Sequence, residues 1–200
     1  MKDMAKSNSS FNDAGIRPAL RDKILFNQEN NAVVIEELGI CRGQVRVDMA
    51  LVNGTFHGYE IKSDRDSLNR LCGQIELYGK VLDYATLVVG EKHVVDAFDM
   101  VPDWWSILRM FPDTETPSFY TLRPGIKNQN RDARSLVELL WLEDAIELLE
   151  TRNATKGVKS KPRRFVWDRV CEQFSVDEIA AVVRAKLKLR AGKLVGSRQS

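Results

Sequence analysis

The sequence has few cysteines and histidines and no long apolar run. It holds three cysteines and two histidines in 200 residues, and no two cysteines have CxxC spacing. This scarcity argues against a disulfide framework and against a zinc site built from these residues. No apolar stretch approaches the roughly 20 residues that are needed to span a bilayer. We therefore expect a reduced, cytoplasmic protein without a membrane partner.

Composition divides the chain into four expected segments. Residues 1–16 are polar and lack the apolar stretch of a secretory signal, so we expect a disordered lead-in. Residues 17–110 carry the periodic apolar patterns of a folded core. Residues 111–130 are rich in proline and predict a loop-rich connection, and residues 131–200 predict a basic helical C-terminal segment.

Charge is distributed unevenly along the chain. The formal net charge is +2, but residues 151–200 carry 13 Lys/Arg against 4 Asp/Glu, a net charge of +9. The first 150 residues carry 17 against 24, a net charge of −7. A basic end on an acidic body is typical of a protein that binds a polyanion, although a solvated helical face can have the same composition. Charge alone leaves both interpretations open.

The apolar periodicity predicts an α/β fold, a mixed β-sheet with flanking helices plus a C-terminal helical segment. Strands are expected at 44–52, 55–62 and 85–89. Helices are expected at 17–27, at 64–82, shortly after Pro102 and three times after residue 130. The segment 32–40 fits either a strand or a helix. The helix between the last two strands implies that those strands are parallel.

Several helix starts are marked by capping residues. Ser63 or Asp64 is expected to cap the helix at 64–82. In the C-terminal segment, two capping boxes are expected, with serine at positions 135 and 175 and glutamate three residues later.

Three charged side chains are expected to lie at one sheet edge. Asp48 is on the first predicted hairpin strand, and Glu60 and Lys62 are two residues apart on the second, so both of the latter point to the same face. Magnesium prefers oxygen ligands, and two carboxylates beside a lysine suit a metal ion that activates water for attack on a phosphodiester. The backbone carbonyl of Ile61 is a candidate third metal ligand.

The hairpin turn decides whether these side chains can converge. Asn53-Gly54 predicts a tight turn. A two-residue turn would place Asp48 opposite Tyr59, with Glu60 on the other face. A three-residue loop with Gly54 in the left-handed region, or a bulge, would set Asp48 opposite Glu60 instead. We expect such an irregularity.

A second polar pair and a set of basic residues complete the candidates. Gln74 and Tyr78 are four residues apart and are therefore neighbours on the predicted helix. There they can bind a phosphate oxygen, a metal-bound water or Lys62, or they can be a solvated amide and a half-buried phenol. Candidate nucleic-acid contacts are Arg46, Arg70, Lys159, Lys161, Arg163 and Arg164.

The spacing Asp-x(11)-Glu-x-Lys followed by Gln-x-x-x-Tyr resembles the PD-(D/E)XK, or restriction-endonuclease-like, nuclease superfamily, in particular its RecB-type branch. The run from Gly58 to Leu71, with Thr86–Gly90, also resembles a small bacterial and prophage-borne family of predicted nucleases. The resemblance covers roughly residues 17–105. It implies a nuclease-like core over 17–110 and assigns no role to the C-terminal helices.

The resemblance implies a site that binds Mg²⁺, with Mn²⁺ as substitute. Its catalytic positions would be Asp48, Glu60, Lys62, Gln74 and Tyr78. The superfamily often has a further upstream glutamate, for which Glu37 is the first choice and Glu36 the second. The metal ligands would then be Asp48, Glu60, Ile61 and Glu37.

Two functions from different classes follow. The first is a Mg-dependent nuclease, a hydrolase of phosphodiester bonds with DNA as the expected substrate. The second is a non-catalytic module that binds nucleic acid or a protein partner, motivated by the charge split. Homodimerisation stays open under both.

Overall fold

The computed structural model describes residues 13–26, 28, 31–111 and 116–196. Most of the predicted lead-in therefore lies outside the described residues. The first described element is helix α1, Asp13–Leu25, which overlaps the helix predicted at 17–27.

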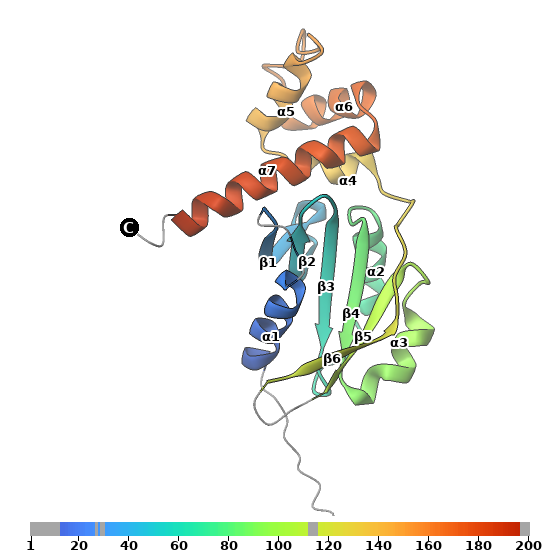
Figure 1. Cartoon of the computed structure of the whole chain (residues 1–200). Coiled ribbons are helices and arrows are strands. Elements are labelled where there is room, and N and C mark those ends of the chain that lie inside the picture. The colour runs from blue at the N-terminus through green and yellow to red at the C-terminus, as the bar shows by residue number, and fades with distance from the viewer. Residues whose placement is uncertain (1–12, 27, 29–30, 112–115, 197–200) are drawn as a thin grey trace, which may run out of the picture.

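A six-stranded mixed sheet forms the centre of the protein, with its strands in sequence order (Figure 1). The strands are β1 Val33–Ile40, β2 Val45–Val52, β3 Phe56–Lys62, β4 Tyr84–Val89, β5 Trp105–Phe111 and β6 Ser118–Arg123. The first three pair antiparallel, β3, β4 and β5 pair parallel, and β6 returns antiparallel. The predicted fold class is confirmed, and the ambiguous segment 32–40 is a strand.

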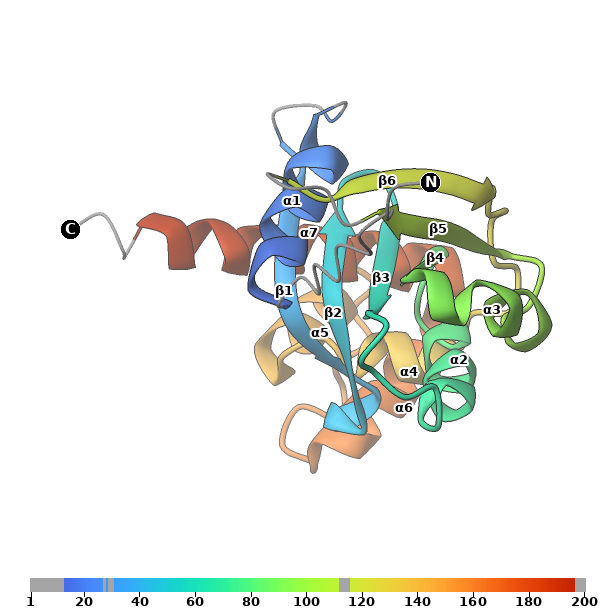
Figure 2. The ribbon, with the colours of Figure 1, turned by 90° about the horizontal axis from the view of Figure 1, so that it is seen from below.

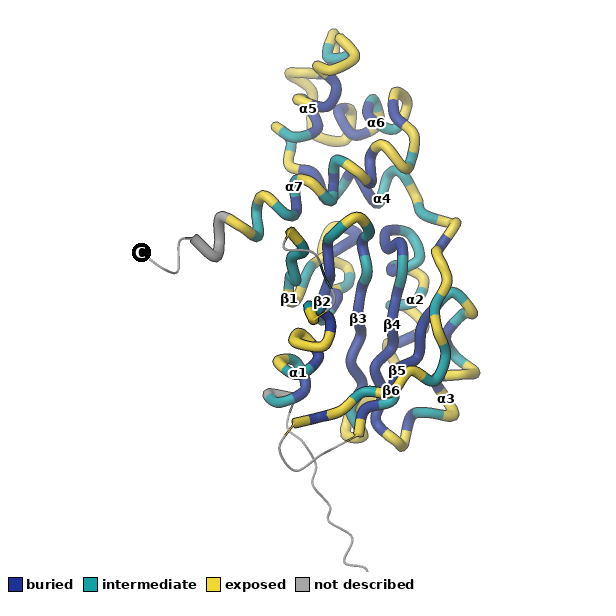
Figure 3. Tube along the Cα trace, in the orientation of Figure 1, coloured by how far each residue is buried: buried dark blue, intermediate teal, exposed yellow. Residues whose placement is uncertain are grey.

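Helices cover both faces of the sheet, so its central strands are buried along their length (Figure 3). Helix α1 places Ile16, Leu20 and Ile24 against one face. Helices α2, Leu71–Gly79, and α3, Val94–Met100, contribute to the larger core on the other face. This two-sided cover is why β4 is a continuous apolar run rather than an alternating one.

Helix α2 is shorter than predicted, because it begins at Leu71 rather than at residue 64. The Ser63 amide and hydroxyl both donate to Asp66 Oδ2, at 2.7 and 2.6 Å. Asp64 Oδ1 accepts from the Lys92 amide at 2.9 Å. These local side-chain bonds stabilise a non-helical loop, so neither Ser63 nor Asp64 caps the helix.

The prediction of a short helix after Pro102 is wrong. Trp105 begins β5 and pairs with Ala85 in the parallel ladder, where its side chain is fully buried. Long-range pairing and burial override the local helical pattern at this position. Strand β6 lies within the predicted loop-rich connection, so part of 111–130 belongs to the sheet.

Four helices follow the sheet and lie beyond one end of it (Figure 1). They are α4 Ala133–Val137, α5 Leu142–Glu150, α6 Arg163–Gln173 and α7 Val176–Gly196. The predicted capping box at Ser175 is confirmed by its reciprocal bonds with Glu178. The predicted box at Ser135 is wrong, because Asp132 is the N-cap of α4 and accepts from the Ser135 amide.

Helix α7 connects the C-terminal helices to the sheet. It contacts β1 and β2 and extends beyond β1 at its C-terminal end (Figure 2). No helix among the described residues is long and apolar enough to cross a membrane.

A buried ion-pair node at Asp83 joins the sheet to the C-terminal helices. The Asp83 side chain is 3% exposed and accepts from Arg131 Nη1 at 2.7 Å and Arg184 Nη1 at 3.3 Å. It also accepts from the Phe56 amide at 2.8 Å. Arg184 lies on α7, and Arg131 precedes α4 and also pairs with Asp177. One carboxylate therefore contacts three separate segments.

We expect Asp83→Ala to lower the free energy of unfolding by about 3–5 kcal/mol, because it removes the buried carboxylate partner of Arg131 and leaves that guanidinium only the exposed Asp177. Urea unfolding measures this loss. The matched control is Asp103→Ala, since Asp103 is 102% exposed and pairs with Arg123 only at 3.6 Å. Equal unfolding midpoints for the two variants would refute a structural role for the node.

Candidate functional site

A polar pocket of about 810 Å³ lies between α1, β2, β3 and the start of α2. We call it the polar pocket and define it by Arg17, Arg46, Asp48, Glu60, Lys62, Arg70 and Gln74, which all line it. The predicted hairpin irregularity positions two of these residues. Val52 pairs with Phe56 and Met49 with Tyr59, so a three-residue loop joins the strands. The paired residues end there, and the same register extended by one residue sets Asp48 opposite Glu60. The loop does not use the left-handed conformation that was one alternative for Gly54, because Gly54 does not have a positive φ.

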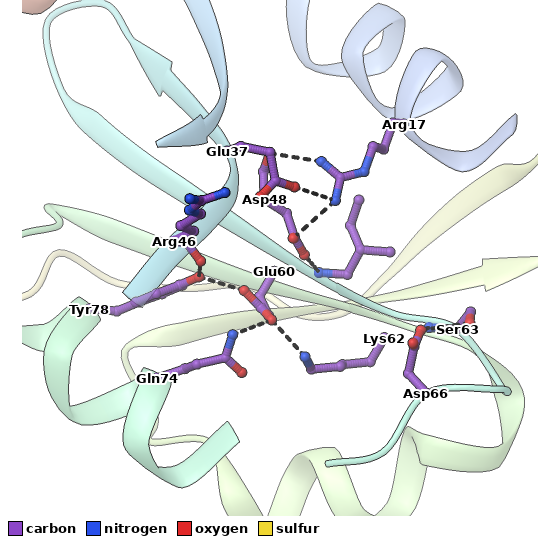
Figure 4. A network of polar contacts seen from close by, with 11 residues as sticks. Arg17, Glu37, Arg46, Asp48, Glu60, Lys62, Ser63, Asp66, Gln74 and Tyr78 are labelled. Carbon is purple, nitrogen blue, oxygen red and sulfur yellow. Dashed lines mark hydrogen bonds and ion pairs between the residues drawn. The ribbon is translucent and has the colours of Figure 1, made fainter. Parts of the chain in front are cut away.

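Glu60 is the centre of a buried hydrogen-bond network (Figure 4). Its Oε1 accepts from Lys62 Nζ at 2.7 Å and from Gln74 Nε2 at 2.5 Å. Its Oε2 accepts from the Tyr78 hydroxyl at 2.5 Å. Since Glu60 is 2% exposed, these three donors replace the water that an ionised carboxylate needs.

The Tyr78 hydroxyl is a permanent donor in this network. Burial and the neighbouring Glu60 carboxylate raise the pKa of Tyr78, so its hydroxyl keeps its proton. The same oxygen lies 2.9 Å from the Arg46 carbonyl, a second acceptor. Tyr78 thereby connects α2 to both β2 and β3, and it is fully buried rather than half-buried.

Asp48 lies beside this network and has its own partners. Its Oδ2 accepts from the Ile61 amide at 2.8 Å, and its Oδ1 accepts from Arg17 at 3.1 Å. Burial, and then repulsion from Glu60, raises the pKa of Asp48 from 3.8 to about 6, against the lowering effects of the Ile61 amide, Arg17 and Lys62. Ile61 therefore contributes its N–H to the site.

Arg17 is a site residue that the sequence did not single out. From α1 it pairs with Asp48 and, at 2.7 Å, with Glu37 Oε1. Glu37 lies in the pocket lining, whereas Glu36 pairs with Arg21 outside it. Helix α1 shows only an apolar stripe and scattered charges in the sequence, so no local signal marked Arg17.

The basic residues predicted to bind nucleic acid fall into two groups. Arg46 and Arg70 line the polar pocket. The other four lie on the connector between α5 and α6 and on the first turn of α6, in the C-terminal helices. The structure therefore does not place the basic connector beside the pocket lining.

The polar pocket does not fit the expected Mg²⁺ site in this arrangement. The oxygens of Glu60 and Asp48 accept from N–H and O–H donors. Among the described residues, no group of three or more His, Cys, Asp or Glu side chains is placed to hold a metal ion. Binding of Mg²⁺ or Mn²⁺ stays a prediction.

The fold and the pocket define an α/β protein whose clustered charges are largely paired with one another. The chain belongs to the bacteriophage P4 protein cII family, whose sequence model matches residues 7–194. It is similar to protein cII of Enterobacteria phage P4, with 27% identity over 96 residues. That match covers 48% of this chain and 36% of the relative, so the chain spans well under half of the relative's length. No solved structure matches the chain.

These comparisons correct the expected identity. The chain belongs to the P4 cII family and not to a PD-(D/E)XK nuclease family, so the interpretation as a Mg-dependent nuclease, a hydrolase of phosphodiester bonds, is wrong. The structure supplies the physical reason. Lys62, Gln74 and Tyr78 each donate to the buried Glu60 carboxylate, so the spacing that resembles a nuclease motif is here the spacing of a buried hydrogen-bond network.

Tyr78→Phe is expected to destabilise the protein by about 1–3 kcal/mol, because it leaves Glu60 Oε2 without its donor in a buried site. Chemical unfolding measures the change. Tyr120→Phe is the control, since Tyr120 is 64% exposed. If Tyr78→Phe unfolds at the same midpoint as the control, the network does not stabilise the fold.

Asp48 should make stability depend on pH. Because its pKa in the folded state, about 6, exceeds its ordinary value of 3.8, the folded protein binds the proton more tightly. This contribution is fully present below the ordinary pKa and is lost as pH rises through the folded pKa. Relative to Asp48→Asn, the wild type should gain stability as pH falls from about 7 to about 4.

Urea unfolding midpoints across that range test the expectation, with Asp99→Asn, a change at an exposed carboxylate on α3, as control. Parallel pH curves for wild type and Asp48→Asn would contradict it.

Proposed function

We propose that the chain is a non-catalytic nucleic-acid-binding module, with DNA as its expected partner. The observation that carries the proposal is a cluster of exposed cations on the connector between α5 and α6 and on the first turn of α6. We call this cluster the basic tip and define it as Lys156, Lys159, Lys161, Arg163 and Arg164. All five are exposed.

Most of the basic tip lacks acidic partners. Lys159 pairs with Glu150 at 2.9 Å. Among the described residues, the other four cations form no ion pair with a carboxylate. Unpaired surface cations are available to replace the counterions along a phosphate backbone, which is the main source of affinity for nucleic acid.

Aromatic rings lie beside the two arginines of the tip. The Arg163 guanidinium is 5.5 Å from the centroid of the Trp167 ring, and that of Arg164 is 4.8 Å from the Phe165 ring. Phe165 is 41% exposed. Arginines held against rings keep their charge and a limited set of orientations, which suits repeated contact with phosphates.

The basic residues of α7 are used differently. Arg184 pairs with Asp83 in the interior node, and Lys186 and Arg190 both pair with Asp144. These pairs neutralise much of the charge that the sequence assigns to the last helix. The unpaired part of the C-terminal charge is therefore concentrated at the tip, at the end of the C-terminal helices that lies away from the sheet (Figure 1).

The test measures binding of a fluorescent duplex of about 20 base pairs with hydroxyl ends. Fluorescence anisotropy gives the affinity at each of a range of salt concentrations. The logarithm of the affinity should fall linearly with the logarithm of salt concentration, by about 0.9 per phosphate contact. Lys156→Ala/Lys161→Ala/Arg164→Ala should weaken binding and reduce the slope by about 3, since each lost cation removes about one contact.

The matched control is Lys23→Ala/Lys92→Ala/Lys127→Ala, which removes the same charge from exposed positions outside the tip. Equal losses in the two triple variants would mean that only net charge matters. Salt-independent binding, or none, would refute nucleic acid as the partner.

A further inference from the structure

The polar pocket contains two cations that the internal network does not use. Arg46 lies on β2 and Arg70 at the N-cap of α2, so they reach the pocket from two different elements. Both residues are exposed. Within the part of the chain that the structure describes, neither guanidinium has a hydrogen-bond, ion-pair or ring partner.

Most of the other charges of the pocket are paired. Lys62 binds Glu60, and Arg17 binds both Asp48 and Glu37. Asp66 accepts from the uncharged amide and hydroxyl of Ser63. The four carboxylates of the lining balance its four cations, and Arg46 and Arg70 are the two cations that no carboxylate among the described residues binds. Their guanidinium groups are therefore available to an anion such as a phosphate.

One buried polar atom of the lining also lacks a partner. Gln74 Nε2 donates to the Glu60 carboxylate at 2.5 Å, which turns the amide oxygen away from Glu60. Gln74 Oε1 is buried and has no hydrogen-bond partner among the residues that the structure describes. A buried acceptor without a donor costs free energy, so a rotation of the Gln74 amide that brings this oxygen to an N–H or O–H of a ligand would be favoured.

The size of the pocket limits the ligand. Its volume of about 810 Å³ lies within the roughly 300–1,000 Å³ range of small-molecule sites. A bare phosphate would fill little of it. A phosphorylated sugar with an attached base provides the anion, the donor and the bulk together.

We propose that the polar pocket binds a phosphate monoester of nucleotide size, with Arg46 and Arg70 on the phosphate and Gln74 Oε1 accepting a hydrogen bond from the rest of the ligand. The ligand is either a free mononucleotide or the phosphorylated end of a strand. This site is separate from the basic tip and does not depend on it.

Calorimetry with inorganic phosphate, 2′-deoxyadenosine and 2′-deoxyadenosine 5′-monophosphate tests the site. The monophosphate should bind more tightly than phosphate, and the nucleoside should not bind measurably. Arg46→Ala/Arg70→Ala should weaken monophosphate binding by roughly tenfold per arginine. Both side chains are exposed, so the variant should fold, which its unfolding midpoint checks.

Lys156→Ala/Lys161→Ala is the matched control, because it removes the same charge from the basic tip and should leave monophosphate binding unchanged. Comparing 5′-phosphorylated with 5′-hydroxyl duplex in this control background separates the two sources. Tighter binding of the phosphorylated duplex that is lost on adding Arg46→Ala/Arg70→Ala would identify a strand end. Binding of the monophosphate without that gain would identify a free nucleotide.

The proposal is overturned if neither the monophosphate nor the 5′-phosphate binds. It is equally overturned if binding is the same in Arg46→Ala/Arg70→Ala and the wild type. The hydroxyl-ended duplex reports on the basic tip alone, so failure of the pocket and failure of the proposed DNA binding give different results.

Discussion

The buried carboxylate of Glu60 is the constraint around which this protein is arranged. An ionised group with 2% exposure must find donors inside the protein, and Glu60 takes them from β3 and α2. Lys62 supplies the compensating charge, while Gln74 and Tyr78 set the position of α2 relative to the sheet. The polar pocket lies beside this network, and Glu60, Lys62 and Gln74 belong to both.

Paired and unpaired cations separate the structural charges from those available to a partner. Arg17, Arg131 and Arg184 each bind a carboxylate of another segment, and Lys62 binds Glu60 on its own strand. By contrast, the two pocket arginines and the cations of the basic tip other than Lys159 present positive charge that no carboxylate among the described residues pairs with. This division explains how a chain with a net charge of only +2 can expose unpaired cations at two separate places.

Much of the fold followed from the sequence, because it depends on local patterns. The Asn53-Gly54 signal and the need to bring Asp48 opposite Glu60 predicted an irregular hairpin, and the three-residue loop confirms it. The strand at 85–89 and its parallel pairing were also correct. Where the sequence failed, a distant partner decided the structure: Trp105 is in a strand because β4 lies beside it.

The candidate site was predictable in its members but not in their chemistry. Side-chain alternation places Glu60 and Lys62 on one face, yet it does not tell whether lysine faces a ligand or the neighbouring carboxylate. Only the packing of α2 decides this, because Tyr78 and Gln74 complete the set of donors to Glu60. The same spacing therefore fitted a nuclease motif, and membership of the P4 cII family corrects that interpretation.

The central claim is that nucleic acid contacts this protein at the basic tip. Backbone amide chemical shifts, recorded while a hydroxyl-ended duplex is titrated into the full chain, test this claim most directly. The account predicts that the largest shifts fall on residues 156–165, with few changes in α1, α3 or the pocket lining. Shifts concentrated on the sheet or on α3, with the connector unchanged, would contradict it.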